Sequence, residues 1–330
     1  MTVVVKVGGA RAVDPAGALA DVASLVKGNP GDRADPVGGA GPHDVVVTHG
    51  GSAAVDETLE RLGVEPEYVE TPSGVVGRFT DAETMDVFEM VLPGLLNTDL
   101  VAGLQSRGVD AVGLSGVDGK LLYGPRKSAV RVVEDGTRKI RRGDHSGSLK
   151  EVNAGLLETL LSEGYTPVVS PPMAGADERE ARSASDGSSS AERSSADSHA
   201  AKPRDDGDEP QDVIPVNTDA DRSAAAIAGA LDATLVLLTD VPGILEEPDD
   251  RGTLIRTVEA PADWERMEAA AEGFMSRKVM AVREALEGGA PEAVVADANV
   301  EPPVATALEG DGTHIYPSAL PDSDSGGDST

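Results

Sequence analysis

Residues 2–9, Thr2-Val3-Val4-Val5-Lys6-Val7-Gly8-Gly9, form a valine-rich run that ends in two glycines. A short apolar run of this kind, bounded by glycine, predicts a β-strand that is buried on both faces. Similar runs recur along the chain, and longer segments with helical periodicity separate them. Strands that alternate with helices are typical of a parallel sheet with helices on both sides. We therefore predict an α/β protein, a three-layer α/β/α sandwich with a mainly parallel central sheet.

The same patterns predict the individual elements. Strands are expected at residues 3–7, 45–48, 111–114, 166–170, 234–239 and 292–296. Helices are expected at residues 16–27, 53–62, 82–91, 95–107, 154–163, 222–231 and 275–287. Pro93-Gly94 predicts a break between the third helix and the fourth, because proline disrupts a helix interior. Within residues 120–142, two apolar runs flank a group of turn residues, and this pattern predicts a β-hairpin.

Three segments have too few apolar residues for a packed element. Residues 28–42 are rich in glycine and proline and predict an elongated loop. Residues 174–212, rich in serine, aspartate, alanine and arginine, predict a disordered insertion, and residues 321–330 predict a disordered tail. The insertion divides the chain into two predicted lobes, residues 1–173 and residues 213–320.

Composition limits the kinds of partner and site. The 330 residues contain 28 Lys and Arg against 58 Asp and Glu, for a formal net charge of −30. This charge argues against binding to nucleic acid or to an anionic membrane, and we interpret it as adaptation to a salty cytoplasm, as in a halophile. Cysteine is absent, which excludes disulfides and thiolate metal sites. The N-terminal residues lack a signal-peptide pattern, and we expect a cytoplasmic protein without a transmembrane helix.

Two glycine-rich turns follow predicted strands and precede predicted helices. Lys6, Gly8 and Gly9 end the first strand, and His49-Gly50-Gly51-Ser52 follows the second. Backbone N–H groups in such turns can approach a phosphate, whose charge the helix N-terminus favours. For each motif alone there is a structural alternative: an ordinary tight turn with an edge lysine for the first, and a structural histidine for the second. Two such turns at neighbouring strand ends favour phosphate binding.

Three further motifs carry candidate site residues. Arg78 precedes a predicted helix and could bind a carboxylate, although for this motif alone a surface arginine beside a helix cap is the better explanation. Asn217-Thr218-Asp219-Ala220-Asp221 crowds polar groups at a helix start, where a helix cap would need only one of them. Lys278 lies in the first turn of another predicted helix, where a cation is unfavourable unless it is exposed or binds an anion. A further segment, Thr239-Asp240-Val241-Pro242-Gly243, leaves a strand at a position where it could border an adenine ring.

Together these motifs resemble the amino acid kinase family. K-x-G-G, H-G-G, S-G-x-D-G at residues 115–119, N-x-D-x-D, L-T-D-V-x-G and G-x-M-x-x-K occur in the order and spacing of that family. Within it, residues 68–81 are most similar to the acetylglutamate kinase branch, especially to archaeal relatives that act on glutamate or 2-aminoadipate attached to the carrier protein LysW. The resemblance covers nearly the whole chain outside the predicted loops.

The resemblance implies a fold like that of carbamate kinase, and a role for each lobe. The N-terminal lobe would bind the acceptor and form a homodimer, and the C-terminal lobe would bind ATP. Magnesium would be held mainly by the ATP phosphates, without a metal site of the protein's own. The implied roles are catalytic for Lys6, Lys278 and Asp221, substrate-binding for Gly50, Gly51, Arg78 and Asn217, and nucleotide-binding for Gly8, Gly9, Thr239, Asp240 and Gly243. Ser52 and Asp219 depart from the pattern of the branch, which often has glycine and asparagine there.

A basic segment in the acidic chain suggests a partner. Residues 120–150 contain nine basic and three acidic side chains, a local charge of +6. We interpret this basic segment as a docking surface for the acidic LysW carrier, although an internally paired hairpin is the alternative. The resulting hypothesis is a kinase that acts on LysW-linked glutamate or 2-aminoadipate in arginine or lysine biosynthesis. The alternatives are an acetylglutamate kinase that acts on the free substrate and a non-catalytic regulator that binds amino acids or nucleotides.

Overall fold

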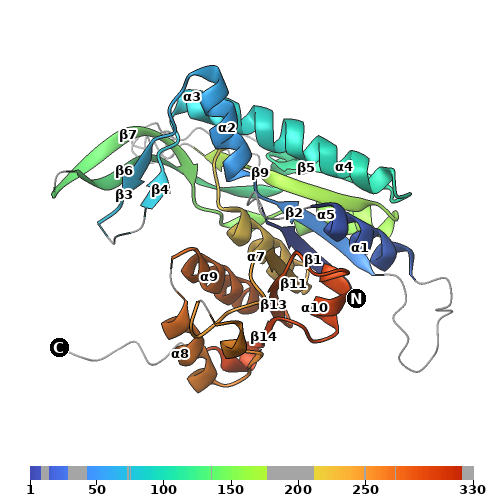
Figure 1. Ribbon diagram of the computed structural model, residues 1–330. Helices are drawn as coiled ribbons and strands as arrows, with labels where there is room; N and C mark the ends of the chain where they lie inside the picture. Colours follow the sequence, from blue (N-terminus) through green and yellow to red (C-terminus); the bar gives the residue numbers. More distant parts are fainter. Residues whose placement is uncertain are drawn as a thin grey trace, which may run out of the picture.

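The computed structural model describes residues 1–8, 15–28, 43–72, 74, 76–134, 136–176, 212–248, 250–271 and 273–321. A single 12-stranded sheet runs through both predicted lobes in the order β12-β14-β13-β11-β1-β2-β9-β6-β7, with β5, β8 and β10 paired beside this path (Figure 1). Its strands are β1 (Thr2–Val7), β2 (Asp44–His49), β5 (Ala111–Gly116), β6 (Leu122–Glu134), β7 (Thr137–Gly147), β8 (Glu151–Val152), β9 (Thr166–Ala176), β10 (Val213–Val216), β11 (Thr234–Thr239), β12 (Thr257–Val258), β13 (Ala293–Asp297) and β14 (Thr313–Ile315).

The first strand occupies the middle of the sheet, between strands of the two predicted lobes. β1 is parallel to β2 on one side and to β11 on the other. Val4 belongs to one hydrophobic core, whereas Val3 and Val5 belong to a second core. Because successive side chains of a strand point to opposite faces, these two cores lie on opposite faces of the sheet. The predicted three-layer sandwich with a mainly parallel sheet is thus confirmed.

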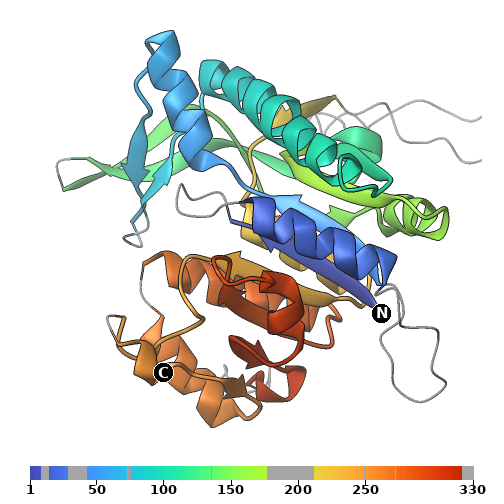
Figure 2. The ribbon, with the colours of Figure 1, turned by 45° about the vertical axis from the view of Figure 1, so that its right-hand side comes forward.

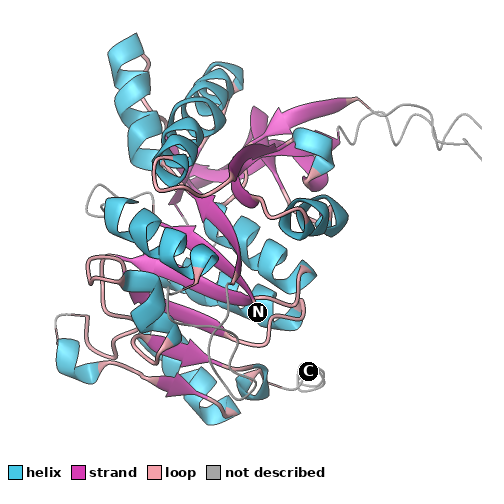
Figure 3. Ribbon diagram, turned by 90° about the vertical axis from the view of Figure 1, so that its right-hand side faces the viewer, coloured by secondary structure: helices cyan, strands magenta, loops and turns pink. Residues whose placement is uncertain are grey.

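Helices cover both faces of the sheet (Figures 2 and 3). The core that contains Val4 is completed by α5 (Ala154–Ser162), α7 (Ala220–Ala230), α8 (Pro261–Ala270) and α9 (Phe274–Glu287). The opposite core is completed by α1 (Pro15–Lys27), α4 (Asn97–Gln105) and α10 (Pro303–Leu308). A smaller core joins α2 (Ser52–Leu62) to α3 (Ala82–Glu89). Alanine and glycine in α7 suit its burial against the sheet, because small side chains permit close packing.

The predicted break at Pro93-Gly94 is wrong. A π-helical segment, η1 (Met90–Leu96), joins α3 to α4, and the helix continues from Ala82 to Gln105. The wider π turn accommodates a proline whose ring would collide with an earlier carbonyl in an α-helix. By length and composition this helix alone, within the described residues, could cross a membrane. Its buried Leu92, Leu100 and Leu104 pack inside the protein, and the core helix of a soluble protein passes the same test.

The predicted hairpin is present, next to a small second sheet. β6 and β7 pair in antiparallel fashion, with Val130 opposite Arg141 and Arg131 opposite Ile140. The second sheet consists of β3 (Tyr68–Glu70) and β4 (Val76–Arg78). Val69 and Phe79 form a small core with Val132 of the hairpin. The hairpin therefore rests on the segment that carries Arg78.

The N-terminal boundary of the predicted insertion also needs correction. β9 continues to Ala176, and Ala176 lies opposite Val213 in an antiparallel pair with β10. Residues 174–176 are therefore strand residues, because pairing with β10 satisfies their backbone groups and the fold buries Ala174. The rest of the insertion, residues 177–211, lies outside the described residues, as do Gly9, residues 29–42 and residues 322–330.

Candidate active site

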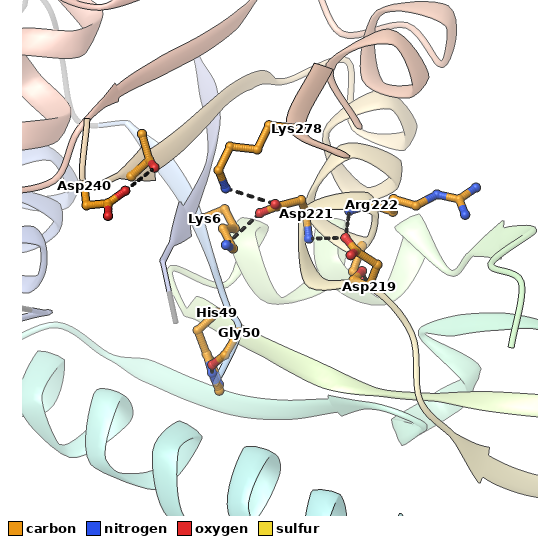
Figure 4. A network of polar contacts seen from close by, with 10 residues as sticks. Lys6, His49, Gly50, Asp219, Asp221, Arg222, Asp240 and Lys278 are labelled. Atoms are coloured by element: carbon orange, nitrogen blue, oxygen red, sulfur yellow. Dashed lines mark hydrogen bonds and ion pairs between the residues drawn. The ribbon is translucent and has the colours of Figure 1, made fainter. Parts of the chain in front are cut away.

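Three parallel strands end at one edge of the sheet and bring the predicted motifs together. β1 lies between β2 and β11, with Val7 opposite His49 and Lys6 opposite Leu237. Ligands of open α/β sheets bind at the carboxyl ends of such strands. Lys6, His49 and Asp240 surround this edge, and Asp221 and Lys278 lie beside Lys6 (Figure 4).

Asp221 is the centre of a cluster of two ion pairs. The Lys6 Nζ lies 2.6 Å from Asp221 Oδ1, and the Lys278 Nζ lies 3.0 Å from Asp221 Oδ2. The side chain of Lys6 is 7% exposed, and those of Asp221 and Lys278 are 13% exposed. Two ammonium groups around one carboxylate leave one positive charge in excess, at a place with little access to water. This Lys6–Asp221–Lys278 cluster suits the binding of an anion.

The two lysines keep Asp221 ionised. Burial acts to raise the pKa of this carboxyl, but the charges of Lys6 and Lys278, and the hydrogen bonds that they donate, lower it to about 2. Asp221 in turn holds both ammonium groups within 3.0 Å of its oxygens. The cluster is thus a fixed arrangement of charges at neutral pH.

Helices α7 and α9 supply two members of the cluster and are tied together nearby. The Arg222 Nε donates to Glu284 Oε2 at 2.8 Å, and the Arg222 Nη2 lies 2.6 Å from Glu284 Oε1. This pair links the first turn of α7 to the body of α9. Arg277, beside Lys278, donates to the backbone oxygen of Val76 in β4 and so links α9 to the small sheet.

The other two polar residues of the 217–221 motif have different contacts. Asp219 is the N-cap of α7, and its Oδ1 accepts from the backbone N–H groups of Asp221 at 2.9 Å and Arg222 at 3.0 Å. Asn217 donates from Nδ2 to Thr80 Oγ1 at 3.2 Å, and its backbone pairs with β7. Asn217 therefore lies between α7 and the segment that follows Arg78.

The glycine turn after β2 is held by buried contacts. His49 is 2% exposed, and its Nδ1 lies 2.9 Å from the backbone oxygen of Gly50. Burial and the nearby charge of Lys6 lower the pKa of His49 to about 4, so the ring is neutral at pH 7. A Cβ atom on Gly51 would lie only 2.7 Å from Leu92 Cδ2 and 2.3 Å from Leu96 Cδ1. A side chain at this position would therefore displace the leucine side chains of η1.

Arg78 lies beside this turn but is held by other side chains. Its Nη2 contacts Asp56 Oδ1, the Tyr68 hydroxyl at 3.0 Å and the backbone oxygen of Ser52 at 3.3 Å. The guanidinium also packs over the rings of Tyr68 and Phe88. Its side chain is 7% exposed, so Arg78 is a buried member of a hydrogen-bonded network and not a surface arginine. The sequence analysis did not identify Asp56 as its partner.

The predicted nucleotide segment leaves β11 on the other side of Lys6. Thr239 is buried, and its Oγ1 donates to Asp240 Oδ1 at 3.2 Å. Gly243 has a φ of 151°, and a Cβ atom there would lie 2.7 Å from Thr313 Oγ1. Packing against β14 is therefore sufficient to explain this glycine. Gly8 lies at the end of β1, whereas Gly9 falls outside the described residues.

Besides Asp56, Asn97 is a second residue at this site that the sequence analysis missed. It is 3% exposed, at the start of α4, and its Nδ2 donates to the backbone oxygen of Val168 at 2.9 Å. The same nitrogen lies 3.3 Å from His49 Nε2. Asparagine is unfavourable within helices, and its place in a long helical run was the signal available in the sequence.

Comparison with known proteins identifies the family. The model of the amino acid kinase family matches residues 1–202 and 203–297. The chain is 39% identical over 316 residues to a LysW-aminoadipate kinase of Thermus thermophilus, covering 95% of this chain and 99% of that protein. It is 41% identical over 275 residues to an acetylglutamate kinase of Methanopyrus kandleri, covering 82% of this chain and 91% of that protein. Its fold is similar to that of the N-acetylglutamate synthase of Neisseria gonorrhoeae, with a TM-score of 0.63 and 20% identity over 96% of this chain and 59% of that chain. The chain is therefore a kinase and belongs to the amino acid kinase family.

Proposed function

We propose that this kinase transfers the γ-phosphoryl group of ATP to the side-chain carboxylate of a glutamate or 2-aminoadipate carried by an acidic LysW-type protein. Similarity to the LysW-aminoadipate kinase of Thermus thermophilus, over nearly the full length of both chains, supports this substrate class. The acyl phosphate product would serve arginine or lysine biosynthesis. The observation that carries the proposed chemistry is the Lys6–Asp221–Lys278 cluster.

In the proposed reaction, the cluster neutralises charge on the transferred phosphoryl group. A carboxylate oxygen of the acceptor forms a bond to the γ-phosphorus while the bond from that phosphorus to the ADP oxygen breaks. Phosphoryl transfer depends on alignment and charge neutralisation, which two fixed ammonium groups supply. The acceptor carboxylate is ionised at neutral pH, so the reaction needs no general base.

The remaining residues of the site have binding roles in this proposal. Backbone N–H groups of Gly8, Gly9, Gly50 and Gly51 would donate to the phosphates and to the acceptor carboxylate. Arg78 and Asn217 would bind the amino-acid part of the acceptor. The network of Arg78 with Asp56 and Tyr68 supports this role, because it fixes the plane of the guanidinium. Thr239, Asp240 and Gly243 would border the nucleotide.

Magnesium fits the site as an ion held mainly by the ATP phosphates. Among the described residues, no group of three or more His, Cys, Asp or Glu side chains could hold a metal ion. The cluster next to the proposed phosphate position has excess positive charge instead. Mg²⁺ commonly binds through substrate phosphates and retained waters, so this set of residues suits it. Bound there, the ion would offset negative charge on the phosphates.

The β6–β7 hairpin supports the proposed carrier as partner. Its strand register puts Arg131, Arg138, Ile140 and Arg142 on one face, and all four side chains are exposed. On the opposite face Arg141 pairs with Glu67 and packs over the ring of Phe79. Internal contacts thus hold Arg141 on the opposite face, and the three exposed arginines around Ile140 suit an acidic protein surface. We call Arg131, Arg138, Ile140 and Arg142 the basic face.

We also propose a homodimer in a salty cytoplasm. The exposed apolar side chains of Leu62, Met90 and Leu95 on α2 and η1 support an association surface in the N-terminal lobe. The net charge of −30 supports adaptation to salt.

The test of this function is ATP consumption with three acceptors: free acetylglutamate, carrier-linked glutamate and carrier-linked 2-aminoadipate. We expect a much higher kcat/KM for a carrier-linked acceptor than for the free compound. Equal kcat/KM for the free and linked forms would contradict the carrier and favour an acetylglutamate kinase. ATP binding without turnover of any of the three would favour a regulator.

A further inference from the structure

We infer that Asn97, the first residue of α4 directly after the π-helical segment η1, is a positioning residue that holds the His49-Gly50-Gly51 turn in its working geometry. The inference rests on the proposed role of Gly50 and Gly51 as backbone donors to the reacting groups. Asn97 and His49 are 48 residues apart in sequence and belong to different layers of the fold. Neither side chain has a role in the proposed transfer itself.

The hydrogen bonds assign a single arrangement to this network. A backbone carbonyl only accepts, so His49 Nδ1, 2.9 Å from the Gly50 oxygen, must carry the proton. The neutral ring then has an acceptor at Nε2, which lies 3.3 Å from Asn97 Nδ2. The second hydrogen on Asn97 Nδ2 is donated to the Val168 oxygen in β9 at 2.9 Å. The amide thus connects the central sheet through His49 to the Gly50 peptide group.

The protonation state of His49 agrees with this arrangement. Burial and the charge of Lys6 hold the pKa of His49 at about 4, so the ring is neutral at pH 7. A protonated ring would have hydrogen on both nitrogens, and its Nε2–H donor would then face the Nδ2 donor of Asn97. It would also add positive charge close to Lys6. A neutral histidine therefore orients the turn without changing the charge of the Lys6–Asp221–Lys278 cluster.

The π-helical register explains how one helix face can make both polar and apolar contacts to the turn. In an α-helix, residues five apart point in directions that differ by about 140°. The i→i+5 bonding of a π-helix brings such residues close to the same face. Leu92, Leu96 and Asn97 therefore face the turn together, with the leucines against Gly51 and the amide on His49. An uninterrupted α-helix would direct Asn97 away from His49.

The first experiment compares Asn97→Leu with a matched control in the same helix. Gln105 also donates from its side-chain amide to a strand backbone oxygen, that of Ala111 at 3.2 Å, but lies two turns away. We expect Asn97→Leu to lower kcat at least about tenfold while the KM for ATP changes little, because misdirected donors weaken transition-state binding. Gln105→Leu should retain the wild-type kcat. Equal kcat for the two folded variants would overturn the inference.

A second measurement uses the wild-type protein and does not depend on catalysis. Nitrogen-15 NMR of the imidazole rings, with the His49 signals identified by their loss in His49→Asn, should show protonated Nδ1 and unprotonated Nε2 at pH 7. An Nε2–H tautomer or an imidazolium would contradict the proposed network even if Asn97→Leu failed to fold. Loss of activity in Lys278→Ala with normal kcat in Asn97→Leu would reject this inference alone. Full activity in Lys278→Ala would reject the proposed site instead.

Discussion

Two carboxylates, two residues apart, have different tasks in this protein. Asp219 accepts two backbone N–H groups and begins α7, whereas Asp221 accepts from two lysines. The difference follows from the direction of the two side chains. The N-cap side chain of Asp219 turns back over the helix start, whereas the first-turn side chain of Asp221 points away from it. A short acidic motif can therefore contain one structural residue and one site residue.

The role of the cluster is tested by Lys278→Ala. This change removes one of two ammonium groups and leaves Asp221 paired with Lys6 alone. We expect kcat to fall by at least about two orders of magnitude, as for the loss of one transition-state donor. Met280→Ala is the matched control, because Met280 lies on the same helix and is 53% exposed. A wild-type kcat in Lys278→Ala would show that the site is assigned wrongly.

The buried His49 should make stability depend on pH. Its pKa is about 4 in the folded protein and about 6.5 when unfolded, so the unfolded chain binds the extra proton between these values. The stabilisation by neutral His49 is therefore complete above about pH 6.5 and decreases as the pH falls towards 4, by up to about 3 kcal/mol.

The measurement is the free energy of unfolding in urea from pH 7 to pH 4.5 at constant salt, for wild type and His49→Asn. The wild type should lose more stability than the variant over this range. Curves that remain parallel would mean that His49 titrates normally in the folded state.

At the scale of elements, the β6–β7 hairpin separates two kinds of arginine. Arg141 stabilises the contact with the small sheet through Glu67 and Phe79, and the basic face points away from that contact. Strand alternation produces this division, since neighbouring residues point to opposite sides. Three arginines of the segment therefore share one surface of the hairpin.

Reversal of Arg131, Arg138 and Arg142 to Glu tests the basic face. We expect a higher KM for a carrier-linked acceptor, with unchanged KM for ATP and little change in kcat, because surface charges act mainly on association. The increase should be smaller in strong salt, where long-range attraction is screened. The control is Arg141→Gln, which should lower stability more than it changes the KM for the acceptor. The measurement is steady-state kinetics at two salt concentrations, after a check of folding by circular dichroism. Carrier docking would be contradicted if the variant and the wild type had the same KM for the carrier-linked acceptor at both concentrations.

Across the whole molecule, one sheet with β1 in its middle joins the two predicted lobes. Lys6 and Lys278 are contributed by opposite ends of the chain, and Asp221 lies between them (Figure 4). The molecule around this positive cluster carries a net charge of −30. Its stability should consequently be sensitive to screening by salt.

We expect the free energy of unfolding in urea to rise by at least about 1 kcal/mol between 0.1 M and 2 M KCl, because the screening length falls to a few ångströms and self-repulsion weakens. Sucrose at matched osmolality serves as control, since it favours compact states without screening charge. A urea midpoint that is unchanged or lower in 2 M KCl would contradict the interpretation of the charge as salt adaptation.

Much of the fold could be predicted from local patterns in the sequence. Valine-rich runs located the strands, and glycine turns after β1 and β2 located the site edge, because buried strands and tight turns have strong local signals. The predicted break at Pro93 and the boundary at residue 174 were wrong. A π turn and the β9–β10 pair depend on what the rest of the fold packs against these segments, and residues near them in sequence do not reveal that.

Patterns of neighbouring residues were sufficient to predict the alternating α/β architecture, the family and the candidates Lys6, Asp221 and Lys278. That Asp221, and not Asp219, joins the two lysines became visible only in the folded chain. Only the tertiary structure also revealed that Asp56 holds Arg78 and that Asn97 holds His49. The physical reason is that a strand or a turn is encoded by neighbouring residues. A buried polar contact, in contrast, is made by residues tens or hundreds of positions apart, and their separation in space follows from the packing of the whole chain.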